Sequence, residues 1–395
     1  MSTIAKPAPR RTANIRSLSV VSFAHGASDF YSGIVPLAVF YVVSREGLSP
    51  AVQGLLIFVW YVTSSIVQPL FGAFSDRNGR WWFLPAAVAT TTLAISCIGL
   101  VGSVPLLVLC IVVGGFGSAI MHPEAGKYAA MVSGERRASG ISVFQIGGQI
   151  GYAIGPPVAG VVLSHYGGVG LLGVSLPGLA AAVLIAALMP HVDRTASAYE
   201  APAASATARE HVDRIGISLL VTSTALRHFT TAAFATYLPN VLVGTGFSLS
   251  AAGAIVGAFL LVASLGLIAG GSLADRLGAV RVSVVTLVAS APCLAGFFLL
   301  LARGETVLGL AAPMLGGVLL AAQTAPGVAL VQSMLPRSLG MALGLMNGVA
   351  FGAGSALVAL VGLYIARVGP RVALLQVSLV PVFAALSFFA MRGRR

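Results

Sequence analysis

Charged side chains are scarce in this sequence. Asp, Glu, Lys and Arg make up 9% of the 395 residues, whereas 57% are hydrophobic and the mean hydropathy is +0.95. An ordinary soluble domain has about 25% charged residues, and no soluble core of this size could bury so much apolar surface. Acidic residues number 11 and basic residues 23. In an apolar chain such an excess marks loops on one side of a membrane, so we expect no nucleic-acid partner.

Cysteines and catalytic motifs are also few. Cys97, Cys110 and Cys293 each fall inside an apolar run, where we expect small buried hydrophobic residues. Their spacing fits neither a disulfide framework nor a metal site. The chain has no HExxH or GxSxG pattern. We therefore expect a protein that is not an enzyme, with no catalytic residues, no cofactor and no resident metal.

The chain contains instead a series of apolar runs of about 20 residues, each long enough to cross a lipid bilayer as a helix. A membrane β-barrel would show shorter segments of alternating polarity. The sequence therefore predicts an all-α polytopic membrane protein with twelve transmembrane helices. The expected spans are residues 17–44, 50–74, 82–102, 105–132, 139–165, 169–190, 215–243, 249–274, 280–302, 305–334, 339–366 and 371–391.

An internal repeat divides the spans into two halves. "GAFSDRNGR" (72–80) closes the second span, and "GSLADRLGA" (271–279) closes the eighth. We expect two six-helix bundles around a central cavity, with the substrate site between them near the bilayer midplane. The expected bundles are residues 17–190 and 215–391, joined by a cytoplasmic linker at 191–214 and flanked by basic tails at 1–16 and 392–395.

The distribution of basic residues predicts the orientation. The tails and the loops after even-numbered spans hold most of them, whereas the opposite loops hold only Arg45, Arg303, Arg367 and Arg371. By the positive-inside rule both termini face the cytoplasm. We interpret residues 1–16 as a retained tail, with an Arg-rich transit peptide as the alternative. The expected location is a bacterial inner membrane, where the protein would function as a monomer.

The two loop copies share a physical role. Their glycines permit tight turns, and their Asp and Arg residues can pair with a neighbour, a helix end or lipid headgroups. Such contacts can hold neighbouring helices together at one end of the bundles and release them again. The second copy has Ala279 in place of the final basic residue, which predicts a weaker charge network. The expected gating residues are Gly72, Asp76, Arg77, Gly79, Arg80, Asp275 and Arg276.

The first span places His25 and Asp29 four residues apart, on one face of a helix. Asp29 lies about 12 residues, roughly 18 Å, from the start of the span and therefore near the bilayer midplane. Loss of water disfavours a charged carboxylate, so a carboxyl at this depth can bind and release a proton near neutral pH. We expect both residues to take part in proton coupling; the alternative is a structural hydrogen-bonded pair.

The fourth span contains "MHPEAGKYA" (121–129), with three ionisable groups and a proline. A charge near the bilayer centre costs about 2.5–3.5 kcal/mol. Glu124 and Lys127 are three residues apart and can pair on one helix face, which lowers that cost. Pro123 leaves a backbone carbonyl without its helical donor. We expect His122 and Glu124 in proton coupling and Lys127 in substrate binding; the alternative is a structural ion pair at a kink.

The seventh span contributes Arg227 and His228 near its middle. A buried Arg stays charged, so it needs a carboxylate partner or an anionic ligand. Together with Lys127 it would suit a phosphonate, phosphate or carboxylate, although an ion pair of Arg227 with Asp29 or Glu124 explains it equally well. The remaining candidates for substrate binding are His228, Gln68, Gln145 and Gln323.

Span 5 contains "GYAIGPPVAG" (151–160), in which three glycines flatten a packing face and proline bends the helix. This pattern resembles the G-x-x-x-G-P-x-x-x-G antiporter motif of the major facilitator superfamily, although any membrane helix can collect small residues and prolines. The loop copies resemble a cytoplasmic loop signature of the same superfamily. The motif positions are Gly151, Gly155, Pro156 and Gly160.

Four segments together resemble one branch of that superfamily. They are "AHGASD" (24–29), "QPLFGAFSD" (68–76), "MHPEAGKYA" (121–129) and "SVFQIGGQIGYAIGP" (142–156). They are similar to the fosmidomycin-resistance proteins, which are drug:proton antiporters. The resemblance implies the major facilitator fold and antibiotic or multidrug efflux. The C-terminal half is matched only by its architecture and loop copy, so the substrate stays open.

Three functions follow from these observations. The first is a secondary active transporter that exports a small, fosmidomycin-like anion in exchange for protons by alternating access. The second is a proton symporter that imports a small organic anion, which fits the same topology and buried carboxylates. The third is an intramembrane enzyme with a metal held by His25, Asp29, His122 and Glu124. The internal repeat and the absent catalytic motifs argue against the third.

Overall fold

The computed structural model describes residues 13–134, 137–197, 213–335 and 344–392, and this part of the chain is built from helices. The N-terminal half comprises α1 (Ile15–Arg45), α2 (Pro50–Tyr61), η1 (Val62–Ile66), α3 (Gln68–Asn78), α4 (Phe83–Cys97), η2 (Ile98–Leu100), α5 (Val104–Val132), α6 (Arg137–Tyr166) and α7 (Gly170–Ser197). The C-terminal half comprises α8 (Arg214–Val243), α9 (Leu249–Leu277), α10 (Ala279–Ala302), α11 (Thr306–Ala322), α12 (Thr324–Met334), η3 (Gly344–Ala350), α14 (Phe351–Ala356), α15 (Val358–Val368), α16 (Pro370–Val377) and α17 (Val380–Arg392).

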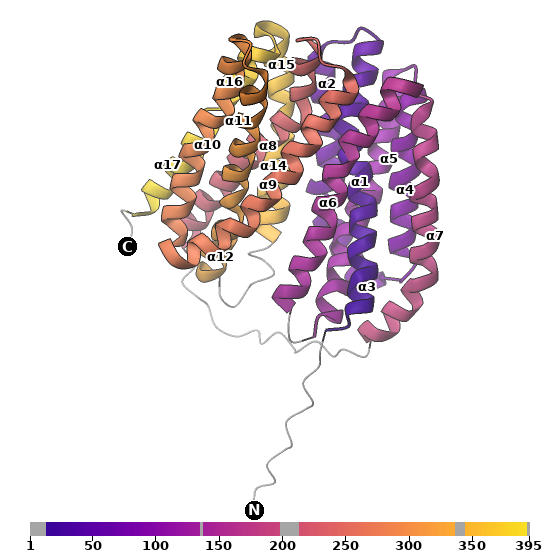
Figure 1. The fold of residues 1–395 in the computed structure, drawn as a ribbon. Helices are drawn as coiled ribbons and strands as arrows, with labels where there is room; N and C mark the ends of the chain where they lie inside the picture. Colours follow the sequence, from indigo (N-terminus) through magenta and orange to yellow (C-terminus); the bar gives the residue numbers. More distant parts are fainter. Residues whose placement is uncertain (1–12, 135–136, 198–212, 336–343, 393–395) are drawn as a thin grey trace, which may run out of the picture.

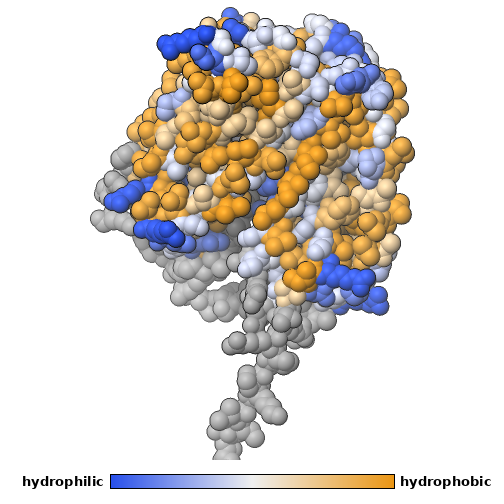
Figure 2. Space-filling model, in the orientation of Figure 1, coloured by the Kyte–Doolittle hydropathy of each residue, from blue (hydrophilic) through white to orange (hydrophobic). Residues whose placement is uncertain are grey.

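The described helices are those of a polytopic membrane protein, as predicted. Eleven segments within them are long and apolar enough to cross a bilayer. Helix α8 is not among these eleven, because it carries Arg227 and several Ser and Thr residues. Its 30 residues are nevertheless long enough to supply the twelfth crossing. Figure 2 shows an apolar belt over the visible face, with hydrophilic residues at its two ends. This surface is suited to a lipid bilayer.

Several predicted spans are broken helices rather than continuous ones. The second span passes from α2 through the π-helical turn η1 into α3, directly before Pro69. The tenth span breaks between α11 and α12 at Gln323, three residues before Pro326. Proline has no backbone N–H to donate within a helix, which explains why the regular pattern is interrupted at these places.

Helix α7 extends seven residues into the stretch predicted as linker, because its last two turns are anchored. Val192 and Ala196 are buried, and Tyr128 Oη donates a hydrogen bond to Asp193 Oδ1 at 2.6 Å. Most of the predicted linker, residues 198–212, lies outside the described residues. The three cysteines, which we expected to be buried, are free and half-buried.

The two halves lie side by side (Figure 1). Their helices are in contact at the end of the molecule opposite to the one where α1 begins. There Gln53 of α2 bonds to the carbonyl of Thr236 and to the side chain of Asn240, both on α8. Helix α6 meets α9 where a Cβ at Gly160 would lie 2.9 Å from the carbonyl oxygen of Leu249. Only backbones without intervening side chains can approach so closely.

Within the N-terminal half, α1 packs against α6 through glycines. A Cβ at Gly26 would come 2.8 Å from the carbonyl oxygen of Gly147, and a Cβ at Gly33, Gly151 or Gly155 would overlap backbone atoms of the facing helix. This close contact fixes α1 against α6. It thereby determines where the polar side chains of α1 point.

Candidate functional site

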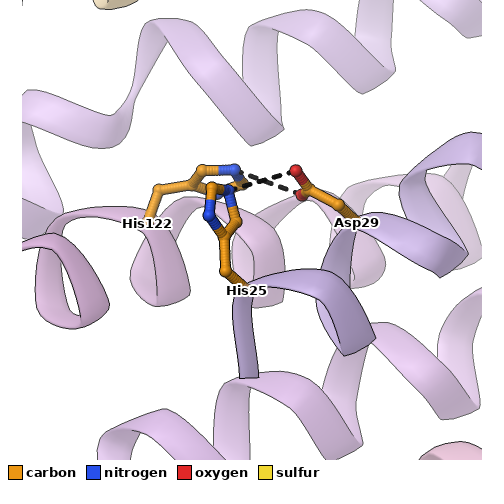
Figure 3. Close-up of side chains that lie close together, drawn as sticks. All are labelled: His25, Asp29 and His122. Carbon is orange, nitrogen blue, oxygen red and sulfur yellow. Dashed lines mark ion pairs between the residues drawn. The ribbon is translucent and has the colours of Figure 1, made fainter. Parts of the chain in front are cut away.

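Two neighbouring imidazoles, with ring centroids 5.1 Å apart, face the carboxylate of Asp29 from the same side (Figure 3). His25 Nε2, one helical turn away on α1, is 3.1 Å from Asp29 Oδ2. His122 Nε2, on α5, is 3.2 Å from Asp29 Oδ1. The side chain of His25 is 4% exposed, that of Asp29 15% and that of His122 27%. The cluster is therefore largely removed from solvent, with its open side at His122.

Backbone carbonyls orient both imidazoles. His25 Nδ1 donates to the carbonyl oxygen of Phe144 on α6 at 2.9 Å, and His122 Nδ1 donates to that of Ser118 at 2.8 Å. Phe144 also stacks on the His25 ring, with centroids 4.1 Å apart. Because a carbonyl only accepts, each Nδ1 carries hydrogen, and each Nε2 is the atom left to face Asp29.

Gly148 on α6 makes room for this cluster. A Cβ at this position would overlap the His25 ring and would lie 2.8 Å from Asp29 Oδ2. Gly148 belongs to the segment "SVFQIGGQIGYAIGP" (142–156) that contributed to the family resemblance, but it was not predicted as a site residue. The signal that could have identified it is the pairing of two adjacent glycines with a histidine on a neighbouring helix.

Glu124 and Lys127 form the predicted pair, and they contact α3. Glu124 is fully buried, and its Oε2 accepts hydrogen bonds from Ser75 Oγ and, at 3.4 Å, from Lys127 Nζ. Lys127 Nζ also lies 3.2 Å from Ser75 Oγ, and a Cβ at Gly79 would be 2.7 Å from it. The pair therefore holds the end of α3, which lies within the first loop copy (72–80).

Arg227 is 4% exposed and makes no ion pair with a carboxylate among the described residues. Its Nη2 donates to His228 Nε2 at 2.7 Å, and its Nε has no hydrogen-bond partner there. The alternative that Arg227 pairs with Asp29 or Glu124 was therefore wrong for this conformation. Lys127, the second cation expected in the substrate cavity, contacts Ser75 of α3, and its role in substrate binding stays a prediction.

The predicted glutamines differ in their surroundings. Gln323 is fully buried at the break between α11 and α12, and neither of its amide atoms has a hydrogen-bond partner in the described structure. Gln68 donates to the carbonyl of Ser64 at 2.7 Å and so supports the break after η1. Gln145 is half-buried on α6.

The loop copies end their helices differently. Gly278 after α9 has φ +88°, a conformation that favours glycine, whereas Gly79 after α3 has φ −54°. A Cβ at Gly72 would lie 3.5 Å from Pro123 of α5, in ordinary contact. The side chain of Asp76 lies outside the described residues, so its gating role stays a prediction. The other loop side chains of this set are exposed, namely Arg77, Arg80, Asp275 and Arg276.

The antiporter motif on α6 packs against two helices. Gly151 and Gly155 face α1, whereas Gly160 faces α9 of the other half, and Pro156 supplies a carbonyl close to Gly253 of α9. The motif therefore contacts both the helix of the carboxylate cluster and the opposite half. Three residues at the boundary between the halves were not predicted, because a single glycine or amide gives no pattern in the sequence. They are Gly253, which faces the motif, and Gln53 and Asn240, which bond to each other.

The His25–Asp29–His122 cluster also has the chemistry of a metal site. One ligand atom from each residue lies within 4.8 Å of the others. Glu124, the fourth residue considered in the enzyme hypothesis, is occupied by Ser75 and Lys127. Two imidazoles and one carboxylate could hold a metal ion or share protons.

Comparison with known proteins identifies the family. The model of the Major Facilitator Superfamily matches residues 18–216 and 220–395. The fosmidomycin resistance protein of Escherichia coli (strain K12) is 26% identical over 387 residues, which cover 95% of this chain and 93% of that protein. An uncharacterized MFS-type transporter of Bacillus subtilis (strain 168) is 27% identical over 390 residues, covering 94% and 91%.

Solved structures share the fold at low sequence identity. A bacterial homolog of the human lysosomal transporter Spinster, in an inward-facing and unoccupied conformation, superposes with a TM-score of 0.77 at 15% identity, covering 95% of this chain and 96% of that one. A D-xylose-proton symporter superposes with a TM-score of 0.71 at 14% identity, covering 95% and 98%. These similarities establish the arrangement of helices.

Proposed function

The chain belongs to the major facilitator superfamily of membrane transporters, and we propose that it exports a small anionic compound in exchange for protons. The observation that carries this proposal is the Asp29 carboxylate, whose two oxygens contact His25 and His122 inside the helix bundle. Similarity to a fosmidomycin resistance protein supports export, with phosphonates as the first substrates to test.

The carboxylate cluster can bind and release protons in a way that changes helix contacts. Each Nε2–oxygen contact requires one hydrogen, and a carboxyl group carries at most one. When both contacts are made, at least one imidazole is therefore protonated. Loss of one proton leaves one contact without hydrogen, either within α1 or between α1 and α5. Proton binding and helix packing are coupled at this point.

Helix α5 links this cluster to the first loop copy. His122 lies two residues from Glu124 and five from Lys127, and the last two hold the end of α3 through Ser75. A shift of α5 on proton loss would be transmitted to residues 72–80. To drive transport, the proton must bind the two conformations of the transporter with different affinity. If the contact of Asp29 on α1 with His122 on α5 exists in one conformation only, it supplies this difference in proton affinity.

The anionic substrate is assigned to the C-terminal half. Arg227 keeps its charge, is buried and has no carboxylate partner among the described residues. A phosphonate, phosphate or carboxylate group would provide the missing acceptors, with bidentate geometry available to guanidinium. The buried amide of Gln323 and the ring of His228 are the further proposed ligands.

The proposal also covers the orientation of the chain in the membrane and its oligomeric state. We assign the end at which α1 begins to the cytoplasm of a bacterium, since the basic loops lie at that end. The bundles 17–190 and 215–391 would rock about the site between them, and each chain would work as a monomer. The hydrogen bonds of Gln53 would close the outer side in the described conformation.

Flux measurements in proteoliposomes test the proposal. An antiporter accelerates uptake of an external labelled phosphonate when the vesicle interior is acidic, because substrate and protons move in opposite directions. Acceleration by an acidic exterior would instead show symport and would overturn the exporter. Empty liposomes with the same gradient give the baseline, and dissipation of the gradient with an ionophore should abolish the acceleration.

A further inference from the structure

The two imidazoles and the carboxylate converge as three electron-pair donors. The backbone carbonyls of Phe144 and Ser118 fix hydrogen on both Nδ1 atoms. In neutral histidines both Nε2 atoms therefore present lone pairs to the Asp29 oxygens, at 3.1 and 3.2 Å. Such a set requires positive charge between its members, and one divalent cation supplies the same charge as two protons.

The surroundings resemble those of histidines that ligate metals. Metal-bound imidazoles usually donate their other N–H to a carbonyl or carboxylate, which fixes the tautomer and the ring orientation. Bonds of about 2.0–2.1 Å to a tetrahedral metal place ligand atoms roughly 3.3 Å apart. The histidine–aspartate distances in the cluster are close to this value, and all three ligand atoms lie within 4.8 Å. Small side-chain rotations would complete the site.

The type of ion follows from the ligands and from access. Two nitrogens and one oxygen favour late first-row metals such as Zn²⁺ and Co²⁺ over Mg²⁺ and Ca²⁺. Glu124 is held by Ser75 and Lys127, so the described residues supply three ligands, and one position is left for water. The exposed edge of His122 provides the route of entry, since its side chain is the most accessible of the three.

We propose that His25, Asp29 and His122 form a binding site for one late first-row divalent cation, and that this ion fixes α5 to α1. Binding of the ion stands on the geometry alone. Inhibition of transport by the ion also rests on the proposed function, because it requires that the contact between α1 and α5 change during the transport cycle.

Direct binding tests the site on the full chain, purified in detergent without a polyhistidine tag. Calorimetric titration with Zn²⁺ should give one site per chain, and Co²⁺ should produce visible d–d absorption. Asp29→Asn and His122→Asn should each weaken Zn²⁺ binding by more than about 100-fold, beyond the effect of losing an outer-shell hydrogen bond. Gly148→Ala should weaken it as well, because the added methyl group displaces His25 and Asp29.

His165 provides the matched control. Its Nδ1 donates to the carbonyl of Val161 at 2.9 Å, as in the two cluster histidines, but it is exposed and has no carboxylate within ion-pair distance among the described residues. His165→Asn should leave Zn²⁺ affinity and the cobalt spectrum unchanged. Size-exclusion profiles and melting temperatures identify any variant that fails to fold.

Two results would overturn the metal site. They are the absence of saturable Zn²⁺ binding to folded wild-type protein, and equal affinity of the wild type and both ligand variants. Binding without any proton-driven flux would refute the proposed function but leave the site intact. Proton-driven flux without Zn²⁺ binding would refute the metal site but leave the proposed function intact. If the metal site and the proposed function are both correct, Zn²⁺ should inhibit flux by the wild-type protein. Undiminished flux at saturating Zn²⁺ would show that the ion does not inhibit transport.

Discussion

Gln53 and Asn240 exchange two hydrogen bonds across the boundary between the two halves. Asn240 Nδ2 donates to Gln53 Oε1 at 2.9 Å, and Gln53 Nε2 donates to Asn240 Oδ1 at 3.2 Å. Gln53 is fully buried and also donates to the carbonyl of Thr236. A transporter that opens at this end must break these bonds, so the pair helps to set the balance between its conformations.

Loss of either amide should favour opening at this end. Gln53→Leu or Asn240→Leu leaves the partner without its hydrogen bonds, which costs about 1–3 kcal/mol in the closed form. Spin labels on Ser103 and Glu305, both exposed at this end, should show a larger population of long distances by electron paramagnetic resonance. The distance distribution of the double Leu variant should be closer to that of the wild type than the distribution of either single variant is. Unchanged distances in both single variants would refute a role for the pair in gating.

Asp29→Asn should separate proton coupling from folding. The amide can still donate a hydrogen bond to one Nε2, so the melting temperature should change by only a few degrees. Gradient-driven flux should fall to the level of empty liposomes, whereas exchange of labelled for unlabelled substrate should persist. Glu305→Gln, an exposed acid without a side-chain cap hydrogen bond, is the control. Gradient-driven flux that survives Asp29→Asn would exclude Asp29 as the proton carrier.

Replacement of Arg227 should raise stability and abolish transport. A buried cation without a carboxylate partner is unfavourable, so Arg227→Met should stabilise the fold by about 1–3 kcal/mol. It should also remove binding of the phosphonate, because no guanidinium remains. Arg303→Met, at an exposed position, should change neither property. Substrate binding of normal affinity in Arg227→Met would move the anion site elsewhere.

Glu124 and Lys127 should be energetically coupled. Lys127→Met removes the cation that faces a fully buried carboxylate, and we expect a loss of about 1–3 kcal/mol, moderated by the partial exposure of Lys127. Glu124→Gln combined with Lys127→Met should lose less than the sum of the single changes. Unfolding in a denaturing detergent measures the stability of the two single variants and of the double variant. Strict additivity would show that the two residues do not stabilise each other.

The contact between α1 and α6 should tolerate no added methyl group. Gly151→Ala would push a Cβ into the backbone of Gly26, so we expect a loss of more than about 2 kcal/mol or failure to fold. Gly126→Ala on α5 is the matched control, because nothing lies within 4 Å of its Cβ position. Alanine there should be neutral or slightly stabilising, since it is the better helix former. Equal melting temperatures of the two variants would contradict the close packing.

Local patterns allowed much of the fold to be predicted, because apolar runs fix membrane helices and short spacings fix neighbours on one helix. The contacts of His25 with Asp29 and of Glu124 with Lys127 are of this kind. The contact of Asp29 with His122 depends on how α1 and α5 cross, which no spacing in the sequence encodes. The same holds for Ser75 beside Glu124 and for Gln53 beside Asn240.

Asp29 and Arg227 lie on different halves of the molecule, and this separation bears on how such a chain diversifies. If Arg227 binds the substrate as proposed, mutations around α8 would change which compound is accepted without altering the residues proposed to exchange protons. Selection by a new toxic compound would then act mainly on the C-terminal half. On the proposed assignment, chimeras that join this N-terminal half to the C-terminal half of a relative should therefore transport the substrates of that relative.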